Sequence, residues 1–168
     1  MSSIEVPTLK TQRLILRPFS LEDADEVYRN FASDEQVTRF LAFDPPRNVS
    51  EARDTINTWC MYCSVPAYFH WAIELIPLGE VIGSLRGIVT EATSVASLDA
   101  CIGRPWWNQG LMTEALAAVM PFFFNTLSIS CLTACHHPDC PAAGHILRNL
   151  GFQPEGIRRR QGYSNQGV

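Results

Sequence analysis

Apolar residues recur at two different spacings along the chain, and these spacings predict alternating strands and helices. Alternation of apolar and polar residues at period two predicts strands over residues 13–19, 69–75, 80–89, 94–103 and 129–136, and again from Phe152 onward. Spacing near 3.6 residues predicts helices after Ser20 and over residues 51–63, 113–127 and 142–150. The predicted order is therefore β-α-α-β-β-β-α-β-α-β.

Local signals mark the ends of these helices. Ser20 is the predicted N-cap of the first helix, with Asp23 three residues later completing a weak capping box. Ser50 is the predicted N-cap of the helix over residues 51–63. Pro121 predicts a kink or a weaker second half in the helix over 113–127, and Gly151 predicts a left-handed residue after the last helix.

The connections between the predicted elements favour a mixed sheet. A turn over residues 77–79 joins two β-rich runs, so these strands form an antiparallel hairpin. The strand-helix-strand connections late in the chain imply at least one parallel pair. We therefore predict one α/β domain over residues 1–168, with a mixed central sheet and helices on both faces.

Composition and charge narrow the class of protein. With 168 residues the chain fits one domain, and its 13 Lys and Arg against 17 Asp and Glu leave a net charge of −4. This balance argues against bulk electrostatic binding of nucleic acid or of an anionic membrane. No apolar run approaches the roughly 20 residues that cross a bilayer, and no export signal is visible. We predict a soluble, cytoplasmic protein.

The six cysteines have two interpretations. One is a tetrahedral zinc site, built from Cys60 and Cys63 together with a group of five residues: Cys131, Cys135, His136, His137 and Cys140. The other is a set of free thiols, since Cys60 and Cys63 lie three apart on a helix and Cys131 and Cys135 share one face of a strand. Because the knuckle turns of zinc fingers are missing, the pattern favours buried core thiols and no metal.

The loop between the third β-rich run and the long helix is the segment most typical of ligand binding. It runs from Ile102 to Ala115, with Gly110 just before the helix and Thr113 in the first turn. Backbone N–H groups at such a helix start point toward one place and favour an anion. An ordinary strand-helix connection would show the same spacing. The chain has neither G-x-x-x-x-G-K-S/T nor G-x-G-x-x-G, which disfavours nucleotide hydrolysis and dinucleotide binding.

Three motifs in order resemble one known family. The runs TQRLILRP from Thr11, WWNQGLMTEA from Trp106 and LRNLGFQPEG from Leu147 are the relevant segments. They resemble the T-x-R-L-x-L-R-P opening, the W-G-x-G-Y-A-T-E-A pyrophosphate loop and the L-x-x-L-G-F-x-x-E-G ending of GNAT (GCN5-related N-acetyltransferase) proteins. The resemblance is to the RimJ/RimL branch, which acetylates the N-termini of ribosomal proteins, and it covers about residues 8–160.

The resemblance implies that acetyl-CoA is the cosubstrate and that no metal is needed. Backbone groups of Ile102 and Gly103 would pair with the pantetheine arm like an added strand. The backbone N–H groups around the pyrophosphate would belong to Asn108, Gln109, Gly110, Leu111, Met112 and Thr113. Cys140 and Ala143 occupy the places of the branch's pantetheine-binding Asn and thiolate-protonating Ser.

These departures leave the acid and the base of the reaction to be found elsewhere. Met112 replaces a usual Gly or Ala, and neither Cys140 nor Ala143 offers the family's side-chain donor. The candidates for acid–base chemistry are Asp99 on the central strand, His137 at the end of the following strand, and Tyr163. Glu74 and His136 are weaker candidates, and each of these side chains could instead be an ordinary surface or turn residue.

The resemblance therefore implies an enzyme that moves acetyl from acetyl-CoA to a primary amine, either a protein or peptide N-terminus or a small amine. A non-catalytic acyl-CoA-binding module is the alternative, because the usual Asn and Ser are replaced. A zinc-stabilised regulatory domain is a third hypothesis. The family's last strand is missing from the pattern after residue 160, so a partner could complete the sheet, and a homodimer stays open.

Overall fold

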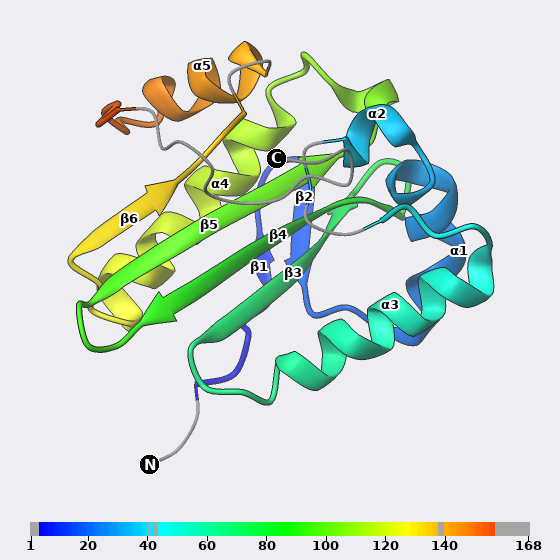
Figure 1. Ribbon diagram of the computed structural model, residues 1–168, viewed down its shortest axis with the longest axis horizontal. Helices are drawn as coiled ribbons and strands as arrows, with labels where there is room; N and C mark the ends of the chain where they lie inside the picture. The colour runs from blue at the N-terminus through cyan, green and yellow to red at the C-terminus, as the bar shows by residue number, and fades with distance from the viewer. Residues whose placement is uncertain (1–3, 40, 42–43, 138–139, 157–168) are drawn as a thin grey trace.

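The computed structural model describes residues 4–39, 41, 44–137 and 140–156, and its centre is one six-stranded sheet (Figure 1). The strands lie in the order β1-β2-β3-β4-β5-β6. Their bounds are β1 Leu9–Lys10, β2 Leu14–Arg17, β3 Tyr68–Leu75, β4 Glu80–Thr90, β5 Val95–Ile102 and β6 Cys131–Ala134. Neighbours from β1 to β5 are antiparallel, and β5 and β6 are parallel. The predicted mixed α/β sheet is confirmed.

Helices pack on both faces of the sheet. The α-helices are α1 Ala24–Val27, α2 Glu35–Thr38, α3 Val49–Tyr62, α4 Leu111–Pro121 and α5 Pro141–Asn149. Figure 1 shows α4 behind the sheet, with α1 and α3 beside it toward the viewer. Of the described residues, none belongs to a helix long and apolar enough to cross a membrane.

Each face of the sheet has its own buried core. On the α4 side, Trp71 of β3 and Leu85 of β4 are fully buried together with Phe123, which follows α4. On the other side, Phe31 in the π-helical turn that follows α1 and Ile56 of α3 are buried against the sheet. Strand side chains alternate between the two cores, which is the period-two pattern seen in the sequence.

The predicted helix ends are correct in two places and wrong in one. Ser20 and Asp23 form the capping box, and Gly151 has φ 94° with Phe152 N–H donating to the Leu147 carbonyl, a Schellman ending. Asn48, not Ser50, is the N-cap of α3, because its side chain accepts the Glu51 N–H at 2.9 Å.

The predicted kink at Pro121 is a change of helix type. The α-helix ends at Pro121, and a π-helical turn over Phe122–Thr126 follows it. The strand expected from Phe152 onward is not formed over residues 152–156, and the rest of that prediction lies outside the described residues.

The prediction of buried core thiols is wrong for the cysteines around β6. Cys131 and Cys135 are exposed, while Cys60, Cys63, Cys101 and Cys140 are partly buried. The reason is that β6 is paired with β5 alone among the described strands, so no neighbouring strand covers its outer side. Among the described residues, no three His, Cys, Asp or Glu side chains gather in a way that could hold a metal ion.

Candidate active site

The parallel strands β5 and β6 separate after four residue pairs and leave part of β5 beside an opening. Within the described residues their pairing ends at Leu98 and Ala134, while β5 continues to Ile102. The opposite edge of β5 stays paired with β4 as far as Gly83 and Ile102. The backbone after Leu98 therefore has a strand partner only on the β4 side, within the described residues, and can accept a strand-like ligand on the other side.

Backbone directions show which groups face this opening. The Gly103 N–H donates to the Ile82 carbonyl of β4 at 2.8 Å, so the N–H and C=O groups of Ala100 and Ile102 point the other way. The Trp107 indole N–H donates to the Ile102 carbonyl at 2.7 Å. The backbone N–H and C=O groups of Ile102 thus face the opening, whereas the N–H of Gly103 is directed toward β4.

Gly103 is needed for a different reason, which is close packing. A Cβ at this position would lie 2.2 Å from the Asn30 carbonyl oxygen and 2.7 Å from the Trp106 ring. Only glycine lets the end of β5 approach the π-helical turn Tyr28–Ala32 so closely.

The loop after β5 ends at the start of α4, where three N–H groups have no acceptor within the helix. Asn108 and Gly110 have φ angles of 61° and 76°, and Asn and Gly are the residues that tolerate this left-handed region best. The Glu114 N–H closes the first helical bond to the Gly110 carbonyl at 3.0 Å. By helix geometry the N–H groups of residues 111–113 lack helical acceptors and favour an anion at the helix start.

A carboxylate of α4 connects this loop to the beginning of the chain. The Glu114 carboxylate accepts hydrogen bonds from the Thr11 hydroxyl at 2.6 Å, the Arg13 backbone N–H at 3.0 Å and Arg13 Nε at 2.9 Å. Arg13 Nη1 donates to the Gln109 carbonyl at 2.9 Å. Burial raises the pKa of Glu114, but the bonds from Thr11 and Arg13 outweigh it and hold that pKa below its usual value. We call these four residues the N-terminal clasp.

The far side of the opening is built by the turn after β6 and by α5. Cys140 is the N-cap residue of α5, and its N–H donates to the His137 carbonyl at 2.9 Å. Cys140 and Ala143 are partly buried there, whereas His137 is exposed. The His136 ring packs against Gly144, where a Cβ would lie 2.7 Å from Nε2. Tyr163 lies outside the described residues.

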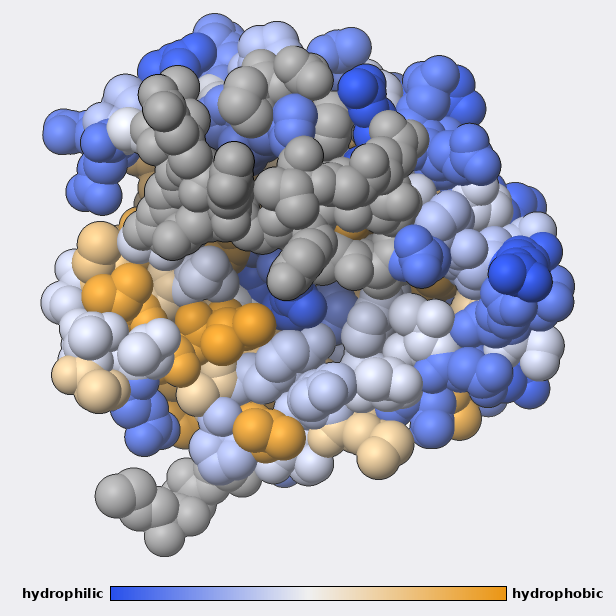
Figure 2. Space-filling model, viewed as in Figure 1, coloured by the Kyte–Doolittle hydropathy of each residue, from blue (hydrophilic) through white to orange (hydrophobic). Residues whose placement is uncertain are grey.

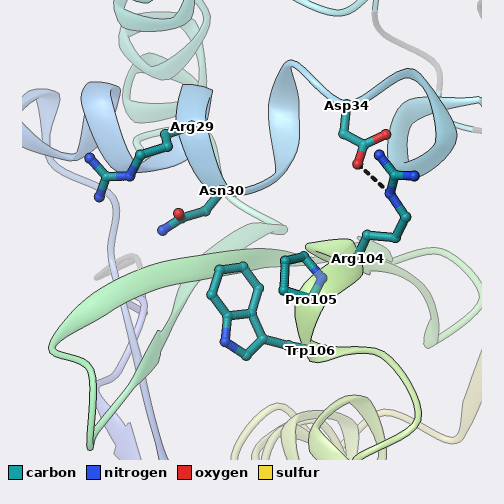
Figure 3. A pocket seen from close by; sticks show the side chains of 6 residues that line it. All are labelled: Arg29, Asn30, Asp34, Arg104, Pro105 and Trp106. Atoms are coloured by element: carbon teal, nitrogen blue, oxygen red, sulfur yellow. Dashed lines mark hydrogen bonds and ion pairs between the residues drawn. The ribbon is translucent and has the colours of Figure 1, made fainter.

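A hollow of about 420 Å³ lies where the loop leaves β5 (Figure 3). Its lining residues are Arg29, Asn30, Asp34, Arg104, Pro105 and Trp106. The Arg104 Nε donates to Asp34 at 2.7 Å, and Arg29 pairs with Glu80 outside the hollow. Because both arginines already have carboxylate partners, the hollow has little unbalanced positive charge for an anion.

The sheet face toward α1 and α3 carries a group of polar residues, of which the sequence analysis named only Asp99. Arg86 of β4 lies across from Asp99 of β5 and from His70 of β3 in the strand register. Arg86 donates to Asp99 Oδ2 from Nε at 3.0 Å and from Nη2 at 2.6 Å. His70 bonds the Ser84 hydroxyl at 2.7 Å and the Tyr68 hydroxyl at 3.2 Å.

Burial determines the protonation of this group. Loss of solvent, with the nearby Arg86 charge, lowers the pKa of His70 to about 3, so the imidazole is neutral at physiological pH. Burial also raises the pKa of Tyr68, although a hydrogen bond with Arg86 opposes the shift, so its hydroxyl stays protonated. The middle of this face, over β4, is hydrophilic in Figure 2, with an apolar area over the adjoining ends of β5 and β6.

Glu74, a weaker candidate, forms an ion pair between neighbouring strands of the sheet. Its carboxylate accepts from Arg17 Nε at 2.8 Å, and Arg17 also pairs with Asp23 of the capping box at 2.9 Å. This ion-pair group joins β2, β3 and the first helical turn.

A mixed sheet that opens between two parallel strands, beside a glycine loop and a helix start, defines an acetyltransferase of the GNAT fold. The chain belongs to the acetyltransferase (GNAT) domain family, whose model matches residues 13–153. It is an N-acetyltransferase of that family, and its neighbours in sequence and structure include ribosomal-protein acetyltransferases of the RimJ/RimL type.

Three similar proteins illustrate the match. The N-acetyltransferase p20 of Bacillus licheniformis is 31% identical over 153 residues, covering 90% of this chain and 85% of that protein. The [ribosomal protein uS5]-alanine N-acetyltransferase of Escherichia coli is 26% identical, covering 94% and 84%. Mycobacterium smegmatis RimJ in complex with CoA-disulfide superposes with a TM-score of 0.82 at 20% identity, covering 95% and 80%.

Proposed function

We propose that this acetyltransferase moves acetyl from acetyl-CoA to a primary amine, and that the leading acceptor is the α-amine of a protein or peptide N-terminus. Membership of the family implies that acetyl-CoA is the acetyl donor. The observation that supports the proposal most is the opening beside Ile102 next to the start of α4. One relative is, by its name, an alanine N-acetyltransferase that acts on ribosomal protein uS5. A small amine such as a polyamine is the second acceptor class.

The backbone geometry supports one set of residues as the acetyl-CoA contacts. The Ala100 and Ile102 backbone would bond the pantetheine amides, and residues 108–113 would surround the pyrophosphate. Cys140 and Ala143 would border the pantetheine from the α5 side. The positions fit because Asn108 and Gly110 adopt left-handed φ angles that turn the loop toward the helix start.

The transfer needs one proton taken from the acceptor and one given to sulfur. The acceptor nitrogen forms the new bond to the acetyl carbon, the C–S bond breaks, and the sulfur of CoA gains a proton as nitrogen loses one. A free α-amine, with a pKa near 8, is partly unprotonated at neutral pH and needs modest help from a base. Asp99, His137 and Tyr163 remain our candidates for these proton transfers.

A thiol-release assay over an acceptor panel tests the proposal. Purified protein with acetyl-CoA should release CoA thiol when given an N-terminal peptide, and at a lower rate with spermidine or an aminoglycoside. His137→Ala should lower the rate if His137 is the base. A protein that binds acetyl-CoA but acetylates no amine in the panel would favour the binding-module alternative.

A further inference from the structure

The polar group on the α1 and α3 side of the sheet has the arrangement of an amine-binding site. Tyr68, Arg86 and Asp99 come from three adjacent strands, β3, β4 and β5, and their polar atoms meet at Arg86. Asp99 lies on β5, the strand that carries the proposed pantetheine contacts, and the group lies on the sheet face away from α4. We propose that Asp99 and Tyr68 bind the acceptor amine and that Arg86 positions both and contacts the neighbouring carbonyl of the acceptor.

Asp99 has one oxygen held in place and one oxygen available. Both Arg86 donors, Nε and Nη2, bond the same oxygen, Oδ2. Within the described part of the chain no hydrogen bond reaches Oδ1, and the side chain is 49% exposed. Because Arg86 occupies Oδ2, the exposed Oδ1 is the oxygen that can accept an N–H bond from the acceptor amine.

Tyr68 is held by a chain of hydrogen bonds that begins in the core. His70 is 2% exposed, and the rings of Phe19 and Trp59 pack on it with centroids 5.0 and 4.7 Å away. When neutral His70 donates from Nε2 to the Ser84 hydroxyl, its Nδ1 accepts a hydrogen bond from the Tyr68 O–H. The Tyr68 oxygen then keeps its lone pairs for Arg86 and for an amine N–H on the open face.

Arg86 makes the site selective for an amine next to a carbonyl. The Arg86 side chain is 33% exposed, and two of its five N–H groups are used by Asp99. The α-amine of a peptide presents N–H donors beside a carbonyl acceptor. These groups match the two acceptors Asp99 and Tyr68 beside the donor Arg86. A polyamine has no carbonyl, and its further positive charges would lie close to the guanidinium. This assignment rests on the proposed function and names the acceptor side of that same site.

Steady-state kinetics with a short peptide amide and with spermidine test the assignment. Asp99→Asn should raise the KM for the peptide about tenfold to a hundredfold, the range for one charged hydrogen bond, and leave the KM for acetyl-CoA unchanged. Arg86→Gln should lower the preference for the peptide over spermidine. Glu91→Gln, on the exposed turn between β4 and β5, is the charge-matched control and should change neither value. A peptide KM unaffected by Asp99→Asn overturns the assignment.

His70 acts through Tyr68, so its test compares the two residues. Tyr68→Phe and His70→Gln should each lower kcat/KM for the peptide, and the double variant should lose no more than the larger single loss. Additive losses would contradict the hydrogen-bond chain. Thermal melts and acetyl-CoA binding identify any variant that fails to fold, and ¹⁵N resonances of the His70 ring in wild type should shift in Tyr68→Phe. A ring unaffected by Tyr68→Phe would also contradict the chain.

A measurement without turnover separates this assignment from the proposed function. The peptide amide is titrated into wild-type protein saturated with CoA, and amide resonances of β4 and β5 are followed. Saturable shifts that disappear in Asp99→Asn support the amine site even if no amine is acetylated. Absence of binding in wild type overturns the site, whereas acetylation with normal kinetics in Asp99→Asn overturns the site and leaves the proposed function standing.

Discussion

Replacing Glu114 with alanine should loosen the N-terminal clasp and destabilise the protein measurably. The substitution removes the acceptor of three hydrogen bonds, one each from the Thr11 hydroxyl, the Arg13 backbone N–H and Arg13 Nε. It leaves Arg13 without its ion-pair partner beside the Gln109 carbonyl. The loop that would bind pyrophosphate therefore loses a constraint at the same time as the fold loses stability.

The size of the effect follows from the exposure of the partners. Hydrogen bonds to a charged group contribute about 1.5 to 3 kcal/mol each. The Arg13 side chain is 39% exposed and regains water when Glu114 is removed, so its share is reduced. We expect a loss of about 2 to 3 kcal/mol in the free energy of unfolding, or about 5 to 10 °C in Tm for a chain of this length.

Thermal and urea melts of Glu114→Ala and Glu114→Gln at several pH values check this prediction. Because the folded-state pKa of Glu114 lies below its usual value near 4.5, its contribution is complete above that value and is lost as pH falls through the folded pKa. The gap between wild type and Glu114→Ala should therefore be full at pH 7 and shrink below pH 4.5. A Tm of Glu114→Ala within about 1 °C of the wild-type Tm at pH 7 would refute the clasp as a stabilising contact.

Three further predictions concern the ligand loop and its neighbours. Acetyl-CoA at about 100 times its Kd should stabilise wild type by about 2.7 kcal/mol in a thermal melt. Gly110→Val should lose this stabilisation, because it puts a β-branched residue at φ 76°. An equal stabilisation of the variant would mean that the phosphates bind elsewhere. Gly103→Ala should cost about 1 to 3 kcal/mol in a urea melt, because its Cβ would overlap the Asn30 carbonyl, and unchanged stability would contradict that close packing. Ala143→Ser combined with Cys140→Asn should raise turnover, because general acid catalysis typically contributes about 10² to 10⁴-fold. No gain in the steady-state rate would mean that α5 does not direct these side chains to the sulfur of CoA.

Local signals in the sequence located the central strands well. The turn over residues 77–79 and the alternation along the chain predicted β3, β4 and β5, with each end within one residue of the observed one. The cap of α3 was misplaced because two good capping residues, Asn48 and Ser50, lie two positions apart. Glu51 stands three residues after Asn48, so the capping-box spacing could have distinguished them.

Tertiary packing determined what the sequence could not predict. The loop before α4 was found because its glycine and helix start are adjacent in the chain. Of the polar group around Arg86 only Asp99 was named from the sequence, because Tyr68, His70 and Asp99 meet only through the register of three strands. In the run FHWAIEL, His70 stands among apolar neighbours and has the appearance of an ordinary strand residue. The exposure of Cys131 and Cys135 depended likewise on where β6 lies in the sheet.

The alternation along β5 separates two kinds of evolutionary change. The backbone groups of Ala100 and Ile102 face the opening whatever their side chains are, because a strand directs its N–H and C=O groups sideways. The side chains of Asp99 and Cys101 point to the face away from α4 and can be exchanged without moving those backbone groups. If β5 carries both proposed sites, single substitutions can change its acceptor preference while its backbone contacts with acetyl-CoA stay the same. Directed evolution of this enzyme should accordingly begin at odd-numbered positions of β5.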